Sequence, residues 1–189
     1  QLEIKPDGKA DFFQWFFYCV EGAQDESLTM RLMNAHSASY QGGWIDYRAV
    51  ASYDQDEWFR VDASFDGREL KITHQPEQDK VFYAYFAPYS TSRYRTYIEN
   101  IKEASVLSHE VLGQTLDGQD IHYFSAGSGP RQLWVIARQH PGETMGSWWM
   151  EGFLARLLDD DDPVSRVMRS KARFHIIPNM NPDGGRHGN

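Results

Sequence analysis

The segment ARQHPGETMG, residues 137–146, places a histidine and a glutamate three positions apart, at His140 and Glu143. Imidazole nitrogen and carboxylate oxygen are both good ligands for Zn²⁺. A catalytic zinc usually has three protein ligands and one position open for water. The pair could therefore supply two ligands of a zinc site. The alternative is that both residues are ordinary polar groups of a turn.

The same spacing occurs a second time, at His74 and Glu77 in the segment HQPE. Spacing alone therefore does not decide which pair binds a metal. Pro76 lies inside the second pair, and the polar residues QDK follow it, a composition typical of a solvated surface loop. We predict that His74 and Glu77 do not bind zinc.

The surroundings of the first pair are different, because the apolar run RQLWVIA, residues 131–137, ends just before it. We expect this run to be a strand buried on both faces, with His140 at its carboxyl end, the edge at which open α/β sheets bind ligands. Pro141 and Gly142 predict a tight turn. Glu143 is then expected in the first turn of a helix, where its charge also interacts favourably with the helix dipole. Spacing and placement leave both alternatives open.

Four further histidines are candidates for a third ligand, and we expect each to be a surface or packed residue instead. His109 and His122 flank a predicted hairpin. His175 alternates within a predicted strand, and His187 lies in a predicted terminal loop.

Residues 1–107 have the pattern of an all-β domain. The segment 58–74 is the clearest hairpin, with two alternating runs joined at Asp66–Gly67, a dipeptide suited to a tight turn. Other runs of aromatic, β-branched or alternating residues lie at 12–20, 27–35 and 81–89. Only residues 92–104 look helical. Many short strands between turn signals predict a β-sandwich.

From residue 108 the pattern changes. A hairpin turning at Asp117–Gly118 is followed by the apolar strand, by two helical segments and by another strand. The helical segments are 144–158 and 163–172, and the last strand lies within 174–182. Strand, helix and strand with a long crossover predict a parallel α/β layer. We therefore predict two domains, residues 1–107 and residues 108–189.

Composition excludes several functional classes. The net charge is −8, and no basic block stands out, which argues against a nucleic-acid surface. The single cysteine, Cys19, cannot form an intrachain disulfide. No charged-then-apolar leader and no long apolar run are present, so we expect no membrane partner and a reducing, cytoplasmic location. The sequence does not indicate an oligomeric state.

Three segments together resemble the M14 zinc metallocarboxypeptidases: RQHPGETMGSWWMEGFLARLL, FHIIPNMNPDG and the terminal GN. The similarity is greatest to the cytosolic carboxypeptidase branch, whose eukaryotic members trim glutamates from tubulin tails. That branch carries a β-sandwich before its catalytic domain. The resemblance therefore implies an all-β sandwich followed by an α/β zinc carboxypeptidase-like domain, with a mixed sheet and flanking helices, which is incomplete in this chain.

The resemblance also implies roles for individual residues. His140 and Glu143 match the first two ligands of one zinc ion. The segment Asn181–Gly184, NPDG, matches the loop that leads toward the site of the substrate carboxylate, so Asn181 and Asp183 are expected at the substrate site. Gly188–Asn189 matches the start of the segment that bears the arginine polarising the scissile carbonyl.

No catalytic residue is expected within the chain itself. The carbonyl-polarising arginine, the Asn–Arg pair that binds the substrate carboxylate, the third zinc ligand (a histidine) and the glutamate general base are all expected downstream of Asn189. The 189-residue chain alone is therefore expected to be inactive. The implied function is zinc-dependent removal of C-terminal residues, acidic ones among the candidates, from peptides or proteins. The alternative is a non-catalytic protein-binding module beside a decayed, metal-free carboxypeptidase-like domain.

Overall fold

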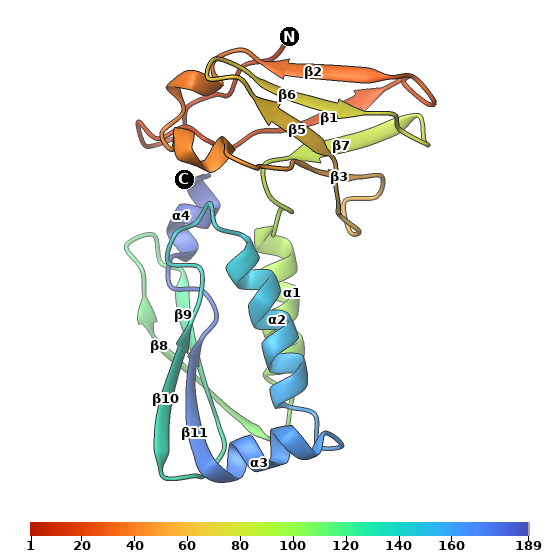
Figure 1. Cartoon of the computed structure of the whole chain (residues 1–189). Helices are drawn as coiled ribbons and strands as arrows, with labels where there is room; N and C mark the ends of the chain where they lie inside the picture. The colour runs from red at the N-terminus through yellow and green to blue at the C-terminus, as the bar shows by residue number, and fades with distance from the viewer. Residues whose placement is uncertain (189) are drawn as a thin grey trace. The chain divides into compact units, whose positions relative to one another are not determined.

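The computed structural model describes residues 1–188, which form two compact units, Gln1–Pro88 and Tyr89–Gly188 (Figure 1). This division differs from the predicted boundary at residue 107. Helix α1 (Thr91–Ile101) belongs to the second unit, because Ile98 is buried in that unit's core. A helix that follows a run of strands carries no local sign of which core it joins. Asn189, the last residue of the expected Gly188–Asn189 match, lies outside the described residues.

The first unit contains two antiparallel sheets. One sheet has the order β1 (Phe17–Glu21), β7 (Lys80–Ala84), β3 (Val50–Ser52) and β4 (Phe59–Arg60). The other has the order β2 (Leu28–Leu32), β6 (Leu70–His74) and β5 (Asp62–Phe65). Two single-turn 3-10 helices, η1 (Ala35–Ser37) and η2 (Gln41–Trp44), connect the sheets.

Both sheets contribute to one buried core. Leu70 and Ile72 of β6 lie in the same apolar cluster as Val81 and Tyr83 of β7. Lys71 and Phe82, which lie between the members of each pair, are more exposed, which is the alternation expected when each sheet buries one face. Trp44 is also buried in this cluster, and its indole N–H donates to the carbonyl of Ala35. The predicted β-sandwich is confirmed.

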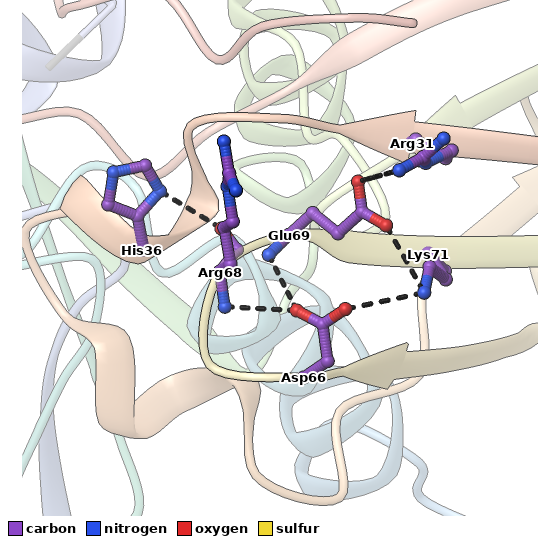
Figure 2. A network of polar contacts seen from close by, with 6 residues as sticks. All are labelled: Arg31, His36, Asp66, Arg68, Glu69 and Lys71. Atoms are coloured by element: carbon purple, nitrogen blue, oxygen red, sulfur yellow. Dashed lines mark hydrogen bonds and ion pairs between the residues drawn. The ribbon is translucent and has the colours of Figure 1, made fainter.

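The hairpin between β5 and β6 turns where the sequence predicted. Gly67 has a φ of +89°, and the Asp66 carboxylate accepts the backbone N–H groups of Arg68 at 3.0 Å and Glu69 at 2.9 Å (Figure 2). These hydrogen bonds favour the charged carboxylate, and together with Lys71 they lower the pKa of Asp66 to about 2. The turn is therefore fixed by its own side chain.

A set of ion pairs links this hairpin to the neighbouring strand β2. The nearly buried Glu69 carboxylate lies 2.7 Å from the guanidinium of Arg31 and 3.1 Å from Nζ of Lys71 (Figure 2). Arg31 and Lys71 are register partners across β2 and β6. The ion pairs of Glu69 with Arg31 and Lys71 therefore help to fix the position of the hairpin against β2.

The second unit contains one mixed sheet with helices. Its strand order is β10 (Arg131–Ile136), β11 (Ala172–Ile177), β9 (Asp120–Ala126) and β8 (Leu107–Gln114). β10 and β11 are parallel, and the other pairs are antiparallel. The remaining helices are α2 (Met145–Leu157), α3 (Pro163–Lys171) and α4 (Pro182–His187). The predicted hairpin is present, with Gly118 at a φ of +73°.

The core of this unit lies between the sheet and helices α1 and α2, which run beside it in Figure 1. Met150 and Leu154 of α2 are buried with Phe124, Phe174 and Ile176 of the sheet. The mixed sheet with flanking helices agrees with the implied fold. Within residues 1–188, no helix has both the length and the apolar character needed to cross a membrane.

The prediction that residues 131–137 are buried on both faces was wrong. Among the described strands, β10 pairs only with β11, so it forms an edge of the sheet. Leu133, Trp134 and Ile136 remain exposed, with Trp134 at 63%. Burial of an apolar run depends on the strand order, which the run itself does not encode.

Candidate metal centre

The candidate ligands lie in a turn between β10 and α2, and their placement corrects two expectations. β10 ends at Ile136, four positions before His140, so the histidine does not follow the strand directly. Helix α2 begins at Met145, so Glu143 precedes the helix rather than lying in its first turn. The reason is that residues 140–143 close their own turn, in which the N–H of Glu143 donates to the carbonyl of His140 at 3.0 Å.

This turn brings the two candidate side chains together. Nδ1 of His140 lies 3.1 Å from Oε2 of Glu143, and the side chains are 74% and 61% exposed. Zinc bonds to nitrogen and oxygen are about 2.1 Å long, so two ligand atoms on one tetrahedral ion lie about 3.4 Å apart. A small adjustment of this pair would therefore accommodate zinc. Within residues 1–188 no cluster of three or more His, Cys, Asp or Glu side chains could hold a metal.

Arg138 anchors the turn from the amino-terminal side. Its Nε donates to the carbonyl of Pro141 at 2.7 Å, and its Nη1 donates to Oγ of Ser147 at 3.0 Å. Ser147 lies in the first turn of α2 and is 4% exposed. Burial lowers the pKa of the Arg138 guanidinium, although it stays charged near neutrality. Sequence reasoning missed this residue, because an arginine after an apolar run gives no sign of where its side chain turns.

The NPDG loop supports the same turn from the other side. Oδ1 of Asn181 accepts the N–H of Gly184 at 2.9 Å and caps helix α4, while Nδ2 donates to the carbonyl of Gln139 at 3.4 Å. Gly184 packs against Pro141 so closely that a Cβ atom there would lie 2.2 Å from the ring carbon Cγ. The two motifs singled out in the sequence are therefore in direct contact.

Asp183, the other expected substrate-loop residue, contacts the β8–β9 hairpin. Its carboxylate accepts the hydroxyl of Thr115 at 2.6 Å and the N–H of Asp117 at 3.3 Å. Asp117 also pairs with His187, which lies in helix α4 and not in a loop as predicted. Asn181 as the N-cap with proline at the next position was the signal for this helix.

The other candidate histidines have partners of their own. His74 ends β6, where its Nδ1 lies 2.8 Å from the Tyr83 hydroxyl, and burial lowers its pKa. Nε2 of His109 and Nδ1 of His122 lie 3.0 Å apart across the β8–β9 hairpin. His175 contacts the Tyr123 hydroxyl at 2.6 Å and a glutamine side chain on β10. These contacts agree with the expectation of packed or surface residues.

Comparison with known proteins agrees with the fold and the motifs. Residues 1–86 match the model of the cytosolic carboxypeptidase N-terminal domain, and residues 94–189 match the zinc carboxypeptidase model. An uncharacterized protein of Zymomonas mobilis is 46% identical over 99% of the chain, and mouse cytosolic carboxypeptidase 4 is 32% identical over 77% of it. A crystal structure of a metallo-carboxypeptidase from Burkholderia cenocepacia superposes with a TM-score of 0.90 at 41% identity, covering 99% of the chain.

The chain spans 49% of the Zymomonas protein, 15% of the mouse protein and 52% of the Burkholderia chain. Both family models together account for nearly all of its residues. The chain belongs to the M14 zinc carboxypeptidase family and carries the N-terminal domain of its cytosolic branch.

Proposed function

We propose that this chain contributes two zinc ligands, His140 and Glu143, to an enzyme that hydrolyses C-terminal residues of peptides or proteins. The observation that carries the proposal is the 3.1 Å approach of the imidazole nitrogen and the carboxylate oxygen on an exposed turn. The family model that covers residues 94–189 is that of the zinc carboxypeptidases, which supports zinc as the metal.

The chemistry follows from the donors. When bound, zinc lowers the pKa of a coordinated water and polarises the scissile carbonyl. His140 would bind through the lone pair of Nδ1, and Glu143 would offset part of the metal charge with its carboxylate. The contacts of Arg138, Asn181 and Gly184 would keep the turn in place, which lowers the cost of ordering the ligands on binding.

The proposal places the rest of the site in polypeptide that would follow Asn189, since the chain spans only 52% of the Burkholderia chain. This part includes the third ligand, the general base, the carbonyl-polarising arginine and the clamp for the substrate carboxylate. Asn181 and Asp183 belong to the loop beside the substrate. Acidic C-terminal residues are the first substrate class to examine. We also propose a cytoplasmic location, in line with the cytosolic carboxypeptidases to which the chain is similar.

A panel of peptides with acidic, neutral and basic C-terminal residues tests this function. We expect the complete gene product to hydrolyse at least one class, to lose that activity with a chelator and to regain it with zinc. The 189-residue chain on its own should not turn over any of them. If the zinc-loaded complete product were inactive on the whole panel, the non-catalytic binding module would be the better description.

A further inference from the structure

The backbone of Arg138 has an unusual conformation directly before the candidate ligands. Its φ is +54°, in the left-handed region that non-glycine residues seldom adopt because it is strained. The residue before it still belongs to the sheet ladder, since the N–H of Ala137 donates to the carbonyl of Ile177. The chain therefore changes direction at Arg138, and the surroundings must stabilise this change.

The side chain provides that stabilisation. It turns back over the next residues and donates from Nε to Pro141 and from Nη1 to Ser147. The two acceptors are a backbone oxygen between the candidate ligands and a hydroxyl on helix α2. A planar guanidinium can donate in two fixed directions at once, which a lysine ammonium on a flexible stem does poorly.

The charge of Arg138 is not used in an ion pair. Among the described residues it has no carboxylate partner, and the guanidinium, which is partly buried, lies 6.0 Å from the centre of the Tyr89 ring. Desolvation of a charge is unfavourable unless it is compensated, and here the two hydrogen bonds and the Tyr89 ring supply that compensation. One bond ends on the turn of His140 and Glu143 and the other on helix α2, so the Arg138 side chain links the turn to the helix.

We propose that Arg138 is a positioning residue for zinc, which holds the His140–Glu143 turn at a fixed distance from helix α2. The inference rests on the proposed function of these ligands. Arg138 does not contact the metal. It holds the Pro141 carbonyl in place. The backbone on either side of Pro141 carries the two ligand side chains, His140 and Glu143, so their positions are held as well.

A second role for Arg138 has to be separated from this one. Arg138 also lines a cavity of about 350 Å³ in the second unit, together with Arg95, His122 and Asn179. A substitution could therefore act through a ligand in the cavity. Arg95 supplies the matched control, because it is an exposed arginine of α1 on the same cavity, and within residues 1–188 no hydrogen bond or ion pair is seen between it and the turn.

The experiment measures zinc affinity in the complete gene product by competition with a chromophoric chelator, without substrate. Removing an outer-shell partner typically weakens metal binding 10- to 100-fold, and we expect about tenfold for Arg138→Met. Arg138→Lys, which can keep one of the two bonds, should fall between Met and the native protein. Ser147→Ala should weaken binding less than Arg138→Met, and Arg95→Met should leave it unchanged.

Cobalt substitution adds a readout that a loss of overall stability would not alter. We expect the visible spectrum of the Co²⁺ form to change in Arg138→Met, because the ligand geometry changes, and to stay native in Arg95→Met. If Arg138→Met does not fold, the zinc affinities and Co²⁺ spectra of Ser147→Ala and Arg138→Lys test the positioning role instead.

The possible failures are distinguishable. Native zinc affinity and a native Co²⁺ spectrum in both Arg138 variants, with zinc lost in His140→Ala, would overturn the positioning role and leave the proposed function intact. Equal weakening in Arg95→Met and Arg138→Met would also overturn it, in favour of an effect through the cavity. Full zinc retention in His140→Ala would instead refute the proposed function.

Discussion

Gly184 and Pro141 are packed so closely that position 184 admits only glycine: a Cβ atom there would lie 2.2 Å from Pro141 Cγ and 2.9 Å from Nδ2 of Asn181. The first helical turn of α4 therefore rests directly on the turn that carries the candidate ligands. The glycine of the NPDG segment is required here for space, since its φ is not in the left-handed region.

Gly184→Ala is predicted to destabilise the second unit by about 1–3 kcal/mol, the usual cost of an added methyl group in a tightly packed position. Gly185→Ala is the matched control, because a Cβ there meets nothing within 4 Å. Alanine is also a better helix former than glycine, by up to about 1 kcal/mol, which favours Gly185→Ala. Urea unfolding of both variants measures the difference. Equal unfolding free energies would show that the close contact with Pro141 is not maintained in solution.

Asn181→Ala is predicted to cost about 0.5–2 kcal/mol, because it removes the N-cap of α4. It also removes the hydrogen bond from Nδ2 to the Gln139 carbonyl, next to His140. Asn181→Ser keeps a capping oxygen and should therefore recover most of the stability. Thermal unfolding of the two variants gives the comparison. A serine variant as unstable as the alanine variant would show that capping is not the main contribution of this side chain.

The stability of the second unit is predicted to fall between pH 7.5 and pH 5.5 through His122. Burial, and then the neighbouring His109, lower the pKa of His122 below its ordinary value of 6.5. The folded state then binds fewer protons than the unfolded state, so its full stability is present above pH 6.5 and is lost as the pH falls below it. Asp120 and Glu99 oppose the shift without reversing it.

His122→Gln should reduce this pH dependence, measured as the change in the urea midpoint of the second unit between the two pH values. His74, whose pKa is also lowered by burial, contributes in the same direction in the first unit. A variant with the same pH dependence as the native chain would contradict the assignment to His122.

The strands and hairpins were predictable because their signals are local. Asp66–Gly67 and Asp117–Gly118 each place a glycine at positive φ, and the alternating runs beside them identify the strands. The sandwich core also follows from this alternation. The exposure of β10 was not predictable, because it depends on which strands become neighbours, and neither was the association of α1 with the second core.

The candidate site was predictable only in part. The His140–Glu143 spacing identified the pair, and the structure brings the two side chains together. The left-handed backbone of Arg138 is a different case, because hydrogen bonds from its own side chain to Pro141 and to Ser147 on α2 stabilise it. A non-glycine residue carries no sequence signal for that conformation, so neither the early end of β10 nor the position of Glu143 before the helix could be derived.

The zinc content of two histidine variants tests the central claim most directly. Two variants of the complete gene product are compared, His140→Ala and His74→Ala. Each removes the histidine of one of the two His-x-x-Glu pairs. The zinc bound per protein is measured by mass spectrometry after gel filtration. His140→Ala is predicted to lose its zinc. His74→Ala is predicted to keep a native content, because His74 is half-buried against the Tyr83 hydroxyl. Full zinc retention in His140→Ala, or loss in His74→Ala alone, would contradict the account.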